Sequence, residues 1–260
     1  MKARLGGFVL LLALTLAGAA RADLSWDQET VTTLKLDGQE RAINTSSRSF
    51  ALKQNVLRLD TPNEPAMFFN FSNGLVVALS YPDQTFMTAS LSELSALNAA
   101  EREKMKSEVA ANLAAISAEP AATGGGQAAL LQAQQKKFDL WSRPYSVRPT
   151  ALRATILGHS CRQYEGLLGD EVFQQLWAAE DVALEPGYRY QLAGNLALFD
   201  PQEYGYLPRI PEFPVMVVSH YGPVTVTASV KRTSSVEIPP DAFVIPADFH
   251  ESEMAFKRKQ

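Results

Sequence analysis

Closely spaced strand patterns joined by tight turns determine the fold class of residues 24–91. A Thr- and Val-rich segment, Glu29–Leu36, runs into Asp37-Gly38, a dipeptide typical of two-residue β-hairpins. A second hairpin is predicted where Met67–Phe71 and Leu75–Ser80 flank a Ser-Asn-Gly loop. These segments lie too close together for the long crossovers that parallel strands need. The sequence therefore predicts an antiparallel meander.

Further strands are predicted from tight turns and from alternating apolar and polar side chains. They cover residues Arg41–Phe50, Ala51–Leu59, Thr85–Ala89, Thr150–Leu157, Ser160–Leu168, Glu171–Ala179, Val215–Tyr221 and Val224–Arg232. The Glu171–Ala179 segment also fits a helix, and its position after a tight turn favours a strand. Along Val224–Arg232 the alternation is regular, so we expect one face of the sheet to be apolar and the other polar.

Two helices are predicted between the strand regions. Ser90 and Glu93 have capping-box spacing, and apolar residues recur at helical intervals from Leu94 to Ile116. This pattern indicates one long amphipathic helix that ends near Ser117, and a second helix is expected over residues 127–141. Residues 119–126 contain a proline and three glycines and predict a hinge. A short helix is expected over residues 188–199, before a proline-rich irregular segment, Pro201–Pro214.

The first 22 residues have the three parts of a cleavable signal peptide. Lys2 and Arg4 precede an apolar run, Leu5–Leu16, and Ala20-Arg21-Ala22 provides a small-x-small cleavage site. The apolar run is too short to cross a bilayer as a helix. The only cysteine, Cys161, does not follow this run, which argues against an N-terminal lipid anchor. We expect cleavage at Ala22/Asp23 and a periplasmic or secreted protein with no membrane anchor.

The net charge of the chain indicates which classes of binding partner are unfavourable. The leader contains three of the 24 basic residues and no acidic one, so residues 23–260 have 21 basic and 28 acidic side chains and a net charge of −7. An acidic surface without a basic stripe repels phosphate backbones and anionic lipid surfaces. Nucleic acid is therefore excluded as a partner, and residues 252–260 are expected to be a flexible basic tail.

No catalytic, metal-binding or cofactor-binding signature is present. Gly158 to Arg162 begins like a nucleophile elbow but lacks its closing glycine, and His159 with Cys161 lacks a third orienting group. The three histidines do not have metal-ligand spacing. Cys161 is expected to be a small buried apolar side chain, with an intermolecular disulfide as the alternative. We therefore predict no enzyme, no metal and no cofactor.

Three motifs, in this order, resemble the uncharacterised exported domains of the outer-membrane lipoprotein carrier (LolA-like) superfamily. They are Tyr-Pro-Asp-x-x-Phe at residues 81–86, Gly-x-x-Cys-x-x-Tyr at residues 158–164, and Pro-x-Ala-Phe-x-x-Pro-Ala at residues 240–247. The resemblance covers residues 24–251 and implies one α+β domain over residues 23–251, with a helical lid inserted at about residues 91–141. Its fold would be a strongly curved antiparallel sheet, a half-open barrel, with helices covering the concave face.

In this family the concave face can hold acyl chains, so the resemblance implies a soluble periplasmic protein that shelters a lipid or an acylated protein. The candidate ligand cavity would be lined by apolar residues of the sheet and the lid: Phe69, Phe71, Leu94, Leu97, Met105, Val109, Leu113, Val224 and Val226. A closed, dry core between helix and sheet is the alternative. A cell-envelope protein-interaction or stress-sensing module without a small ligand also remains open, with Pro201–Pro214 as its contact surface.

Overall fold

The computed structural model describes residues 23–118, 125–183, 189, 192, 204–235 and 237–252. Strands, helices and one 3-10 turn (η1) follow one another along these residues. In chain order they are β1 Leu24–Leu36, β2 Gln39–Lys53, β3 Val56–Asp60, β4 Ala66–Asn70, β5 Leu75–Ser80, β6 Thr85–Ser90, α1 Leu91–Ala118, α2 Gly125–Trp141, β7 Tyr145–Ile156, β8 His159–Leu168, β9 Glu171–Ala183, β10 Glu212–Tyr221, β11 Val224–Ser234, η1 Pro240–Phe243 and β12 His250–Glu251.

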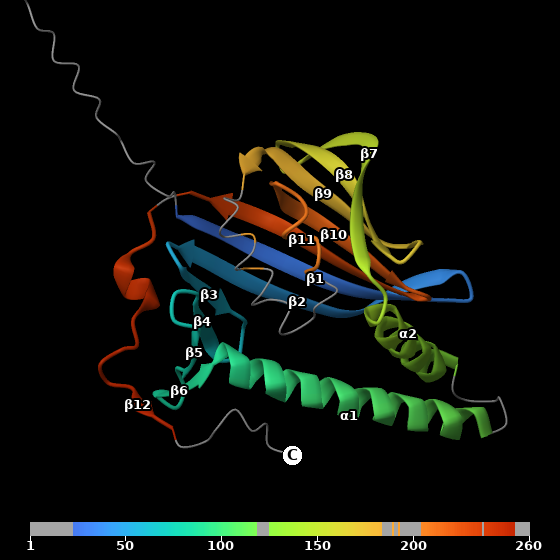
Figure 1. Cartoon of the computed structure of the whole chain (residues 1–260), viewed down its shortest axis with the longest axis horizontal. Helices are drawn as coiled ribbons and strands as arrows, with labels where there is room; N and C mark the ends of the chain where they lie inside the picture. Colours follow the sequence, from blue (N-terminus) through green and yellow to red (C-terminus); the bar gives the residue numbers. More distant parts are fainter. Residues whose placement is uncertain are drawn as a thin grey trace, which may run out of the picture.

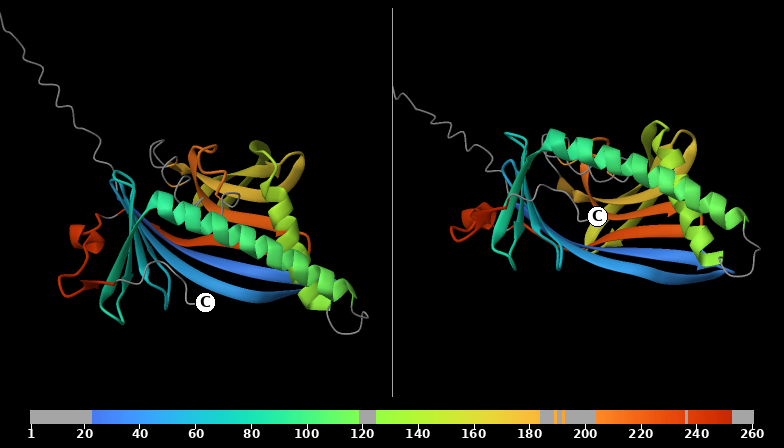
Figure 2. Two further views of the ribbon diagram at one scale, coloured as in Figure 1. Left: turned by 60° about the horizontal axis from the view of Figure 1, so that its bottom comes forward. Right: turned by 90° about the horizontal axis from the view of Figure 1, so that it is seen from below.

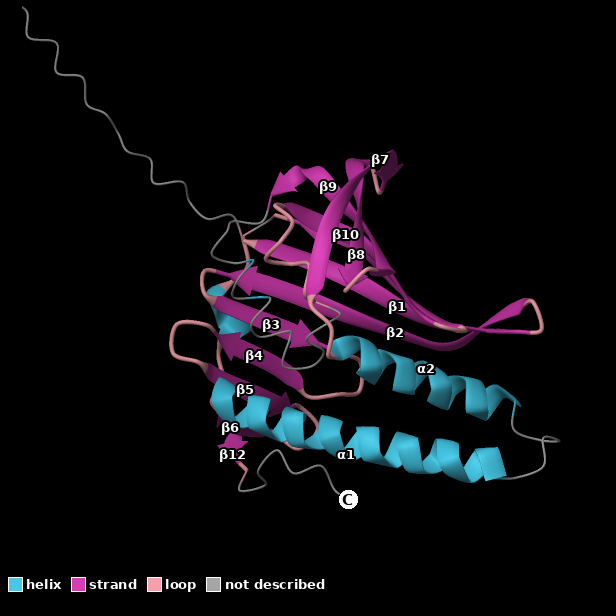
Figure 3. Cartoon of the chain, turned by 45° about the vertical axis from the view of Figure 1, so that its right-hand side comes forward, coloured by secondary structure: helices cyan, strands magenta, loops and turns pink. Residues whose placement is uncertain are grey.

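All the described strands belong to one curved sheet that does not close on itself (Figure 1). The strand order is β12-β6-β5-β4-β3-β2-β1-β11-β10-β9-β8-β7, and each neighbouring pair is antiparallel except the short β12–β6 pair. The helix α1 begins beside β6 and runs along the inner side of the sheet, with α2 packed next to it (Figures 2 and 3). The predicted fold class, an α+β half-open barrel, is confirmed.

Strand β1 joins the two halves of the sheet. It pairs with β2 through the hairpin at Asp37-Gly38, where both residues have positive φ, 51° and 78°. On its other side it pairs with β11, so that Thr32 lies opposite Val226 although the two are far apart in the chain. The Asp-Gly pair adopts the left-handed conformation that a two-residue hairpin requires. This confirms the first predicted hairpin.

The segment predicted as a strand over Ala51–Leu59 is instead interrupted by a turn. Gln54 has a φ of 50°, and the chain reverses there between β2 and β3. Its apolar residues still share one face, because Leu52 lies opposite Leu57 across the new pair. The sequence carried no glycine or proline at this position, which is why the turn was missed.

Strands β4 and β5 are covered on both faces. Phe69 is fully buried on the inner side, whereas its neighbour Phe68 is buried on the outer side with Leu79. The outer side is covered by the segment that follows β11, since Phe68 contacts Phe243 of η1 at 6.4 Å between ring centroids. Adjacent residues of a strand point to opposite faces, which explains this division. The sheet is therefore not polar on its whole outer surface.

The start of α1 is fixed by the predicted capping box. The Ser90 amide donates to Glu93 Oε2 at 2.7 Å, and the Glu93 amide donates to Ser90 Oγ at 3.1 Å. These reciprocal bonds satisfy two donors that a helix terminus leaves open. The same bonds lower the pKa of the Glu93 carboxyl. The helix then extends to Ala118, one residue beyond the predicted end.

Most of the remaining predicted elements agree with the structure where it describes them, with two differences at their ends. The helix α2 begins at Gly125, within the predicted hinge, and β10 begins at Glu212, within the segment predicted to be irregular. Residues 171–183 form a strand, which settles the ambiguity of that segment. The turn between β7 and β8 lies at Leu157-Gly158, one residue earlier than expected. The leader, residues 119–124 of the hinge, most of the short helix at 188–199 and all but Ser252 of the basic tail lie outside the described residues.

No helix in the described part of the chain combines the length and hydrophobicity that spanning a bilayer requires.

Candidate functional site

The inner face of the sheet carries a large apolar cluster at the end nearest β6. The pairing of the strands places its members on one face of the sheet, because Trp26 lies opposite Phe50 and Leu57 lies opposite Phe69. The Trp26 and Phe50 rings stack at 4.6 Å between centroids. We call this group the large inner cluster; its sheet residues include Trp26, Phe50, Leu52, Leu57, Leu59, Phe69, Val76, Tyr164, Leu176, Phe213, Val215 and Val217.

Two other parts of the chain complete the large inner cluster. Leu94, in the first turns of α1, packs into it from the helix side. Tyr206, Leu207 and Ile210, in the second half of the proline-rich segment, are also buried in it. The Arg189 side chain holds this segment through a 2.8 Å bond from Nη1 to the Ile210 carbonyl. The apolar side chains of residues 204–210 therefore contribute to the core.

A second apolar group, the small inner cluster, lies where α2 packs on the sheet. From the helix it receives Ala129, Ala133 and Leu140, and from the sheet it receives Leu34, Leu168, Phe173, Tyr221 and Val224. Lys137 Nζ lies 5.3 Å from the centroid of the Tyr221 ring, an arrangement that favours a cation–π contact. This packing holds the C-terminal part of the helical pair against β10 and β11.

Polar side chains separate the two clusters on the inner face of β1 and β2. The register places Gln28 opposite Arg48 and Thr30 opposite Ser46, and Arg48 is two residues from Phe50 on the same face. All four polar side chains are partly buried. The Arg48 Nε is buried and has no hydrogen-bond partner. Arg48 is thus placed between two apolar regions, and its buried Nε has no acceptor among the described residues.

The structure divides the predicted cavity residues into separate groups. Phe69, Phe71 and Leu94 belong to the large inner cluster or pack against it. Val224 and Val226 occur in the small inner cluster or at its edge. The sequence therefore identified apolar residues at both ends of the inner face.

The remaining four predicted residues lie on α1 and differ in exposure. Val109 is buried, and Leu113 lines a cleft of about 220 Å³ between α1 and α2, together with Leu140. Leu97 and Met105 are 47% and 45% exposed, so the apolar stripe of the helix is not buried along its whole length. The physical reason is that α1 packs on β6 at its start and on α2 further along.

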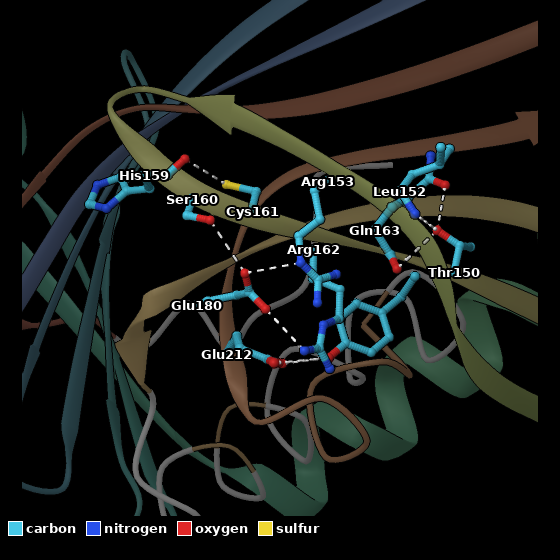
Figure 4. Close-up of polar contacts among 11 residues, drawn as sticks. Thr150, Leu152, Arg153, His159, Ser160, Cys161, Arg162, Gln163, Glu180 and Glu212 are labelled. Atoms are coloured by element: carbon cyan, nitrogen blue, oxygen red, sulfur yellow. Dashed lines mark hydrogen bonds and ion pairs between the residues drawn. The ribbon is translucent and has the colours of Figure 1, made fainter.

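A charged network occupies the inner face near the start of β8 (Figure 4). Arg162 Nη2 lies 3.0 Å from Glu180 Oε1, and the Tyr164 hydroxyl donates to both oxygens of Glu212 at 2.8 and 2.9 Å. Burial, with the neighbouring Glu212 carboxylate, raises the pKa of the Tyr164 hydroxyl to about 12. Arg153 also approaches Glu180, at 3.4 Å. The network ties β7, β8, β9 and β10 together.

The residues that resemble a nucleophile motif have structural partners in this network or next to it. His159 Nδ1 lies 2.9 Å from Asp181 Oδ2, and Ser160 donates to Glu180 Oε2 at 3.3 Å. The Cys161 thiol is fully buried and donates to the His159 carbonyl at 3.4 Å. Burial raises the pKa of this thiol, which favours its protonated form. Cys161 is thus the small buried side chain that the sequence predicted.

Sequence reasoning missed two parts of the inner face. Arg48 was assigned to a strand and given no role, although its place two residues before Phe50 on the same strand puts it on the apolar side. That spacing is a signal that could have found it. The inward packing of Tyr206, Leu207 and Ile210 has no such signal, because the prolines around them break any regular pattern.

The comparisons with known proteins give fold-level likenesses only. No protein-family model matches the sequence, and no curated protein matches it. PNGF-II is 9% identical with a TM-score of 0.34, over 87% of this chain and 31% of PNGF-II, so the chain spans about a third of that protein's length.

Two further solved structures have lengths closer to that of this chain. A LolA superfamily protein from Nitrosomonas europaea is 8% identical with a TM-score of 0.30, over 85% of this chain and 90% of that one. The lipoprotein LppX from Mycobacterium tuberculosis is 11% identical with a TM-score of 0.26, over 80% of this chain and 84% of LppX. At these values the likenesses assign neither a family nor a ligand, and membership of the LolA-like superfamily stays a prediction.

Proposed function

We propose that this protein is an exported, periplasmic binding protein that shelters the apolar part of a ligand between α1 and the inner face of the sheet. The ligand would be a lipid or the acyl chain of an acylated protein. Residues 1–22 would be removed as a signal peptide, with Asp23 as the first residue of the mature chain. The proposal assigns a binding role and no chemical reaction.

One observation carries the proposal: two residues on the same face of α1 have opposite environments. Leu94 is 6% exposed, whereas Met105, about three helical turns later and therefore on the same face, is 45% exposed. The helix thus begins in the large inner cluster and leaves an apolar side chain uncovered further along. An uncovered apolar side chain beside a curved sheet with apolar regions is a surface on which an acyl chain could be buried.

The energy available from such burial is sufficient for useful affinity. Each buried methylene group contributes about 0.8 kcal/mol. Roughly fifteen of them, about 12 kcal/mol, would offset an association cost of about 4 kcal/mol and leave the roughly 8 kcal/mol that micromolar binding requires. Methionine suits this role, because its unbranched thioether adapts to ligands of different shape.

The neutral fluorescent probe N-phenyl-1-naphthylamine tests this proposal directly. The purified protein should enhance the fluorescence of the probe with a micromolar dissociation constant, and native mass spectrometry should detect co-purified lipid. Met105→Glu should weaken probe binding by roughly tenfold or more, because a carboxylate would face the bound chain. Leu152→Glu is the matched control: Leu152 is 56% exposed on the edge strand β7, and its replacement should leave binding unchanged.

Absence of both probe binding and co-purified lipid would overturn the proposal. Equal loss of binding in the Met105 and Leu152 variants would also contradict it, because that result would place the probe somewhere other than beside α1.

A further inference from the structure

Among the partly buried charged residues of β1, β2 and β11, Arg48 is the one without a partner in the described part of the chain. Its Nε is buried without an acceptor, and within the described residues no ion pair or hydrogen bond engages its guanidinium. Its cross-strand neighbour is the neutral Gln28, and the next pair on the same face is Thr30 with Ser46. No carboxylate of these two strands therefore faces Arg48.

The acidic residues of β1 are on the opposite face and are already paired. Arg232 Nη2 lies 2.8 Å from Asp27 Oδ2, and Lys231 Nζ lies 2.6 Å from Glu29 Oε1. Alternation along β1 explains the division, since Asp27 and Glu29 flank the inward-facing Gln28. In the described part of these strands, Lys231 and Arg232 are thus paired on the outer face, whereas Arg48 on the inner face is not.

A second donor without a partner faces the same side of the sheet from α1. Asn98 follows Leu94 by four residues, which places both on one helix face, and Asn98 Nδ2 is buried with no acceptor. Buried polar groups in proteins are almost always hydrogen-bonded, and unpaired buried charge is strongly disfavoured. Two donors without acceptors, on β2 and on α1, point to an acceptor that the described residues do not supply.

We infer that Arg48 binds the oxyanion headgroup of an amphiphilic ligand, a carboxylate or a phosphate, while the chain of that ligand lies against the neighbouring apolar side chains. A guanidinium offers five donors in a planar fork that matches these headgroups, and the clusters on either side of Arg48 offer apolar contact. This inference rests on the proposed function, and it specifies the class of ligand: an anionic amphiphile in preference to a neutral one.

Displacement of N-phenyl-1-naphthylamine by three competitors tests the inference. The competitors are myristate, the neutral tetradecanol and acetate, which represent an anionic amphiphile, its uncharged analogue and a free anion. The unmodified protein should bind myristate at least about tenfold more tightly than tetradecanol, since hydrogen bonds to a charged group are worth this much. Acetate at the same concentration should displace no probe, because it lacks the chain.

Arg48→Met should abolish the preference for myristate and leave the affinity for tetradecanol unchanged. Arg48→Lys should retain part of the preference, because the positive charge remains. If the Arg48→Met protein folds poorly, the reduced preference of Arg48→Lys tests the same inference. Arg41→Met is the matched control, because Arg41 is an exposed arginine of the same strand with a local bond to Gln39. It should keep the full preference for myristate.

Several outcomes would overturn the inference. Equal affinity of the unmodified protein for myristate and tetradecanol would do so and would leave the proposed binding function intact. Equal weakening of both ligands by Arg48→Met would show that Arg48 acts through packing alone. Displacement of the probe by acetate would indicate a free-anion site. Failure of the unmodified protein to bind any probe would overturn the proposed function together with this inference.

Discussion

The two faces of the central strands differ in whether their charged side chains are paired. On the outer face of β1 and β11, Asp27 and Glu29 are each paired with a cation of the same face. On the inner face, Arg48 is partly buried, more deeply than those outer cations, and has no partner among the residues that the structure describes. An exposed ion pair contributes little to stability, whereas an unpaired buried charge opposes folding. This difference is the basis for the proposal that the headgroup of a ligand binds on the inner face and not on the outer one.

The largest change in the free energy of unfolding is expected on the inner side of the sheet. Two substitutions in α1 test whether this side is divided into a packed region and an open region. Leu94→Ala should lower the free energy of unfolding by about 2–5 kcal/mol, because it removes a side chain from a closed cluster. Met105→Ala, on the same helix face, should change it by no more than about 0.5 kcal/mol. Urea denaturation of both variants measures the two values. Similar losses would mean that Met105 is packed as tightly as Leu94.

A smaller effect is expected when a buried polar pair of the inner face is broken. Tyr164→Phe should lower the free energy of unfolding by about 1–3 kcal/mol at neutral pH, because the Glu212 carboxylate loses a hydroxyl donor in a partly buried place. Tyr81→Phe is the control, since Tyr81 is 49% exposed and its replacement should have a smaller effect.

The same variant should change how stability depends on alkaline pH. The folded-state pKa of Tyr164 is raised to about 12, above the value of about 10 expected in the unfolded chain. Its contribution is therefore fully present below pH 10 and is lost as the pH rises through 12. Urea denaturation between pH 8 and about pH 12 should show a shallower decline for Tyr164→Phe than for the unmodified protein. Identical slopes would contradict the assignment.

The smallest effect is expected on the outer face. Lys231→Ala should lower the free energy of unfolding by less than about 1 kcal/mol, because its ion pair with Glu29 is exposed to solvent. Most of this difference should vanish in roughly 1 M NaCl, where charges are screened within a few ångströms. Lys35→Ala, at an exposed end of β1, provides the control. A loss that persists in high salt would show that Lys231 acts through packing.

Most of the sheet could be predicted because its signals are local. Asp37-Gly38 specifies a hairpin through the backbone conformation of two residues, and Ser90 with Glu93 specifies where α1 begins through two hydrogen bonds. The turn at Gln54 was missed, because a residue without special turn chemistry adopts positive φ there only in response to the packing on either side.

The candidate site was predicted only in part, because it depends on contacts between distant segments. Helical periodicity placed Leu94 and Met105 on one face correctly, but it could not show that the first is buried and the second is not. That outcome depends on where α1 leaves the sheet. The absence of a partner for Arg48 likewise depends on the register of β1 against β2, which places Gln28 opposite it.

The position of β1 also has a consequence for the order of folding. The hairpin of β1 with β2 can form as soon as β2 has been synthesised. The other edge of β1 pairs with β11, which ends at Ser234, so this pairing can form only much later. Pairing between such distant segments slows folding and leaves an open strand edge in the meantime. A nascent chain would therefore hold an incomplete half-sheet, susceptible to aggregation, until β11 had been made. Such a chain would benefit from a chaperone that covers β1 until β11 arrives.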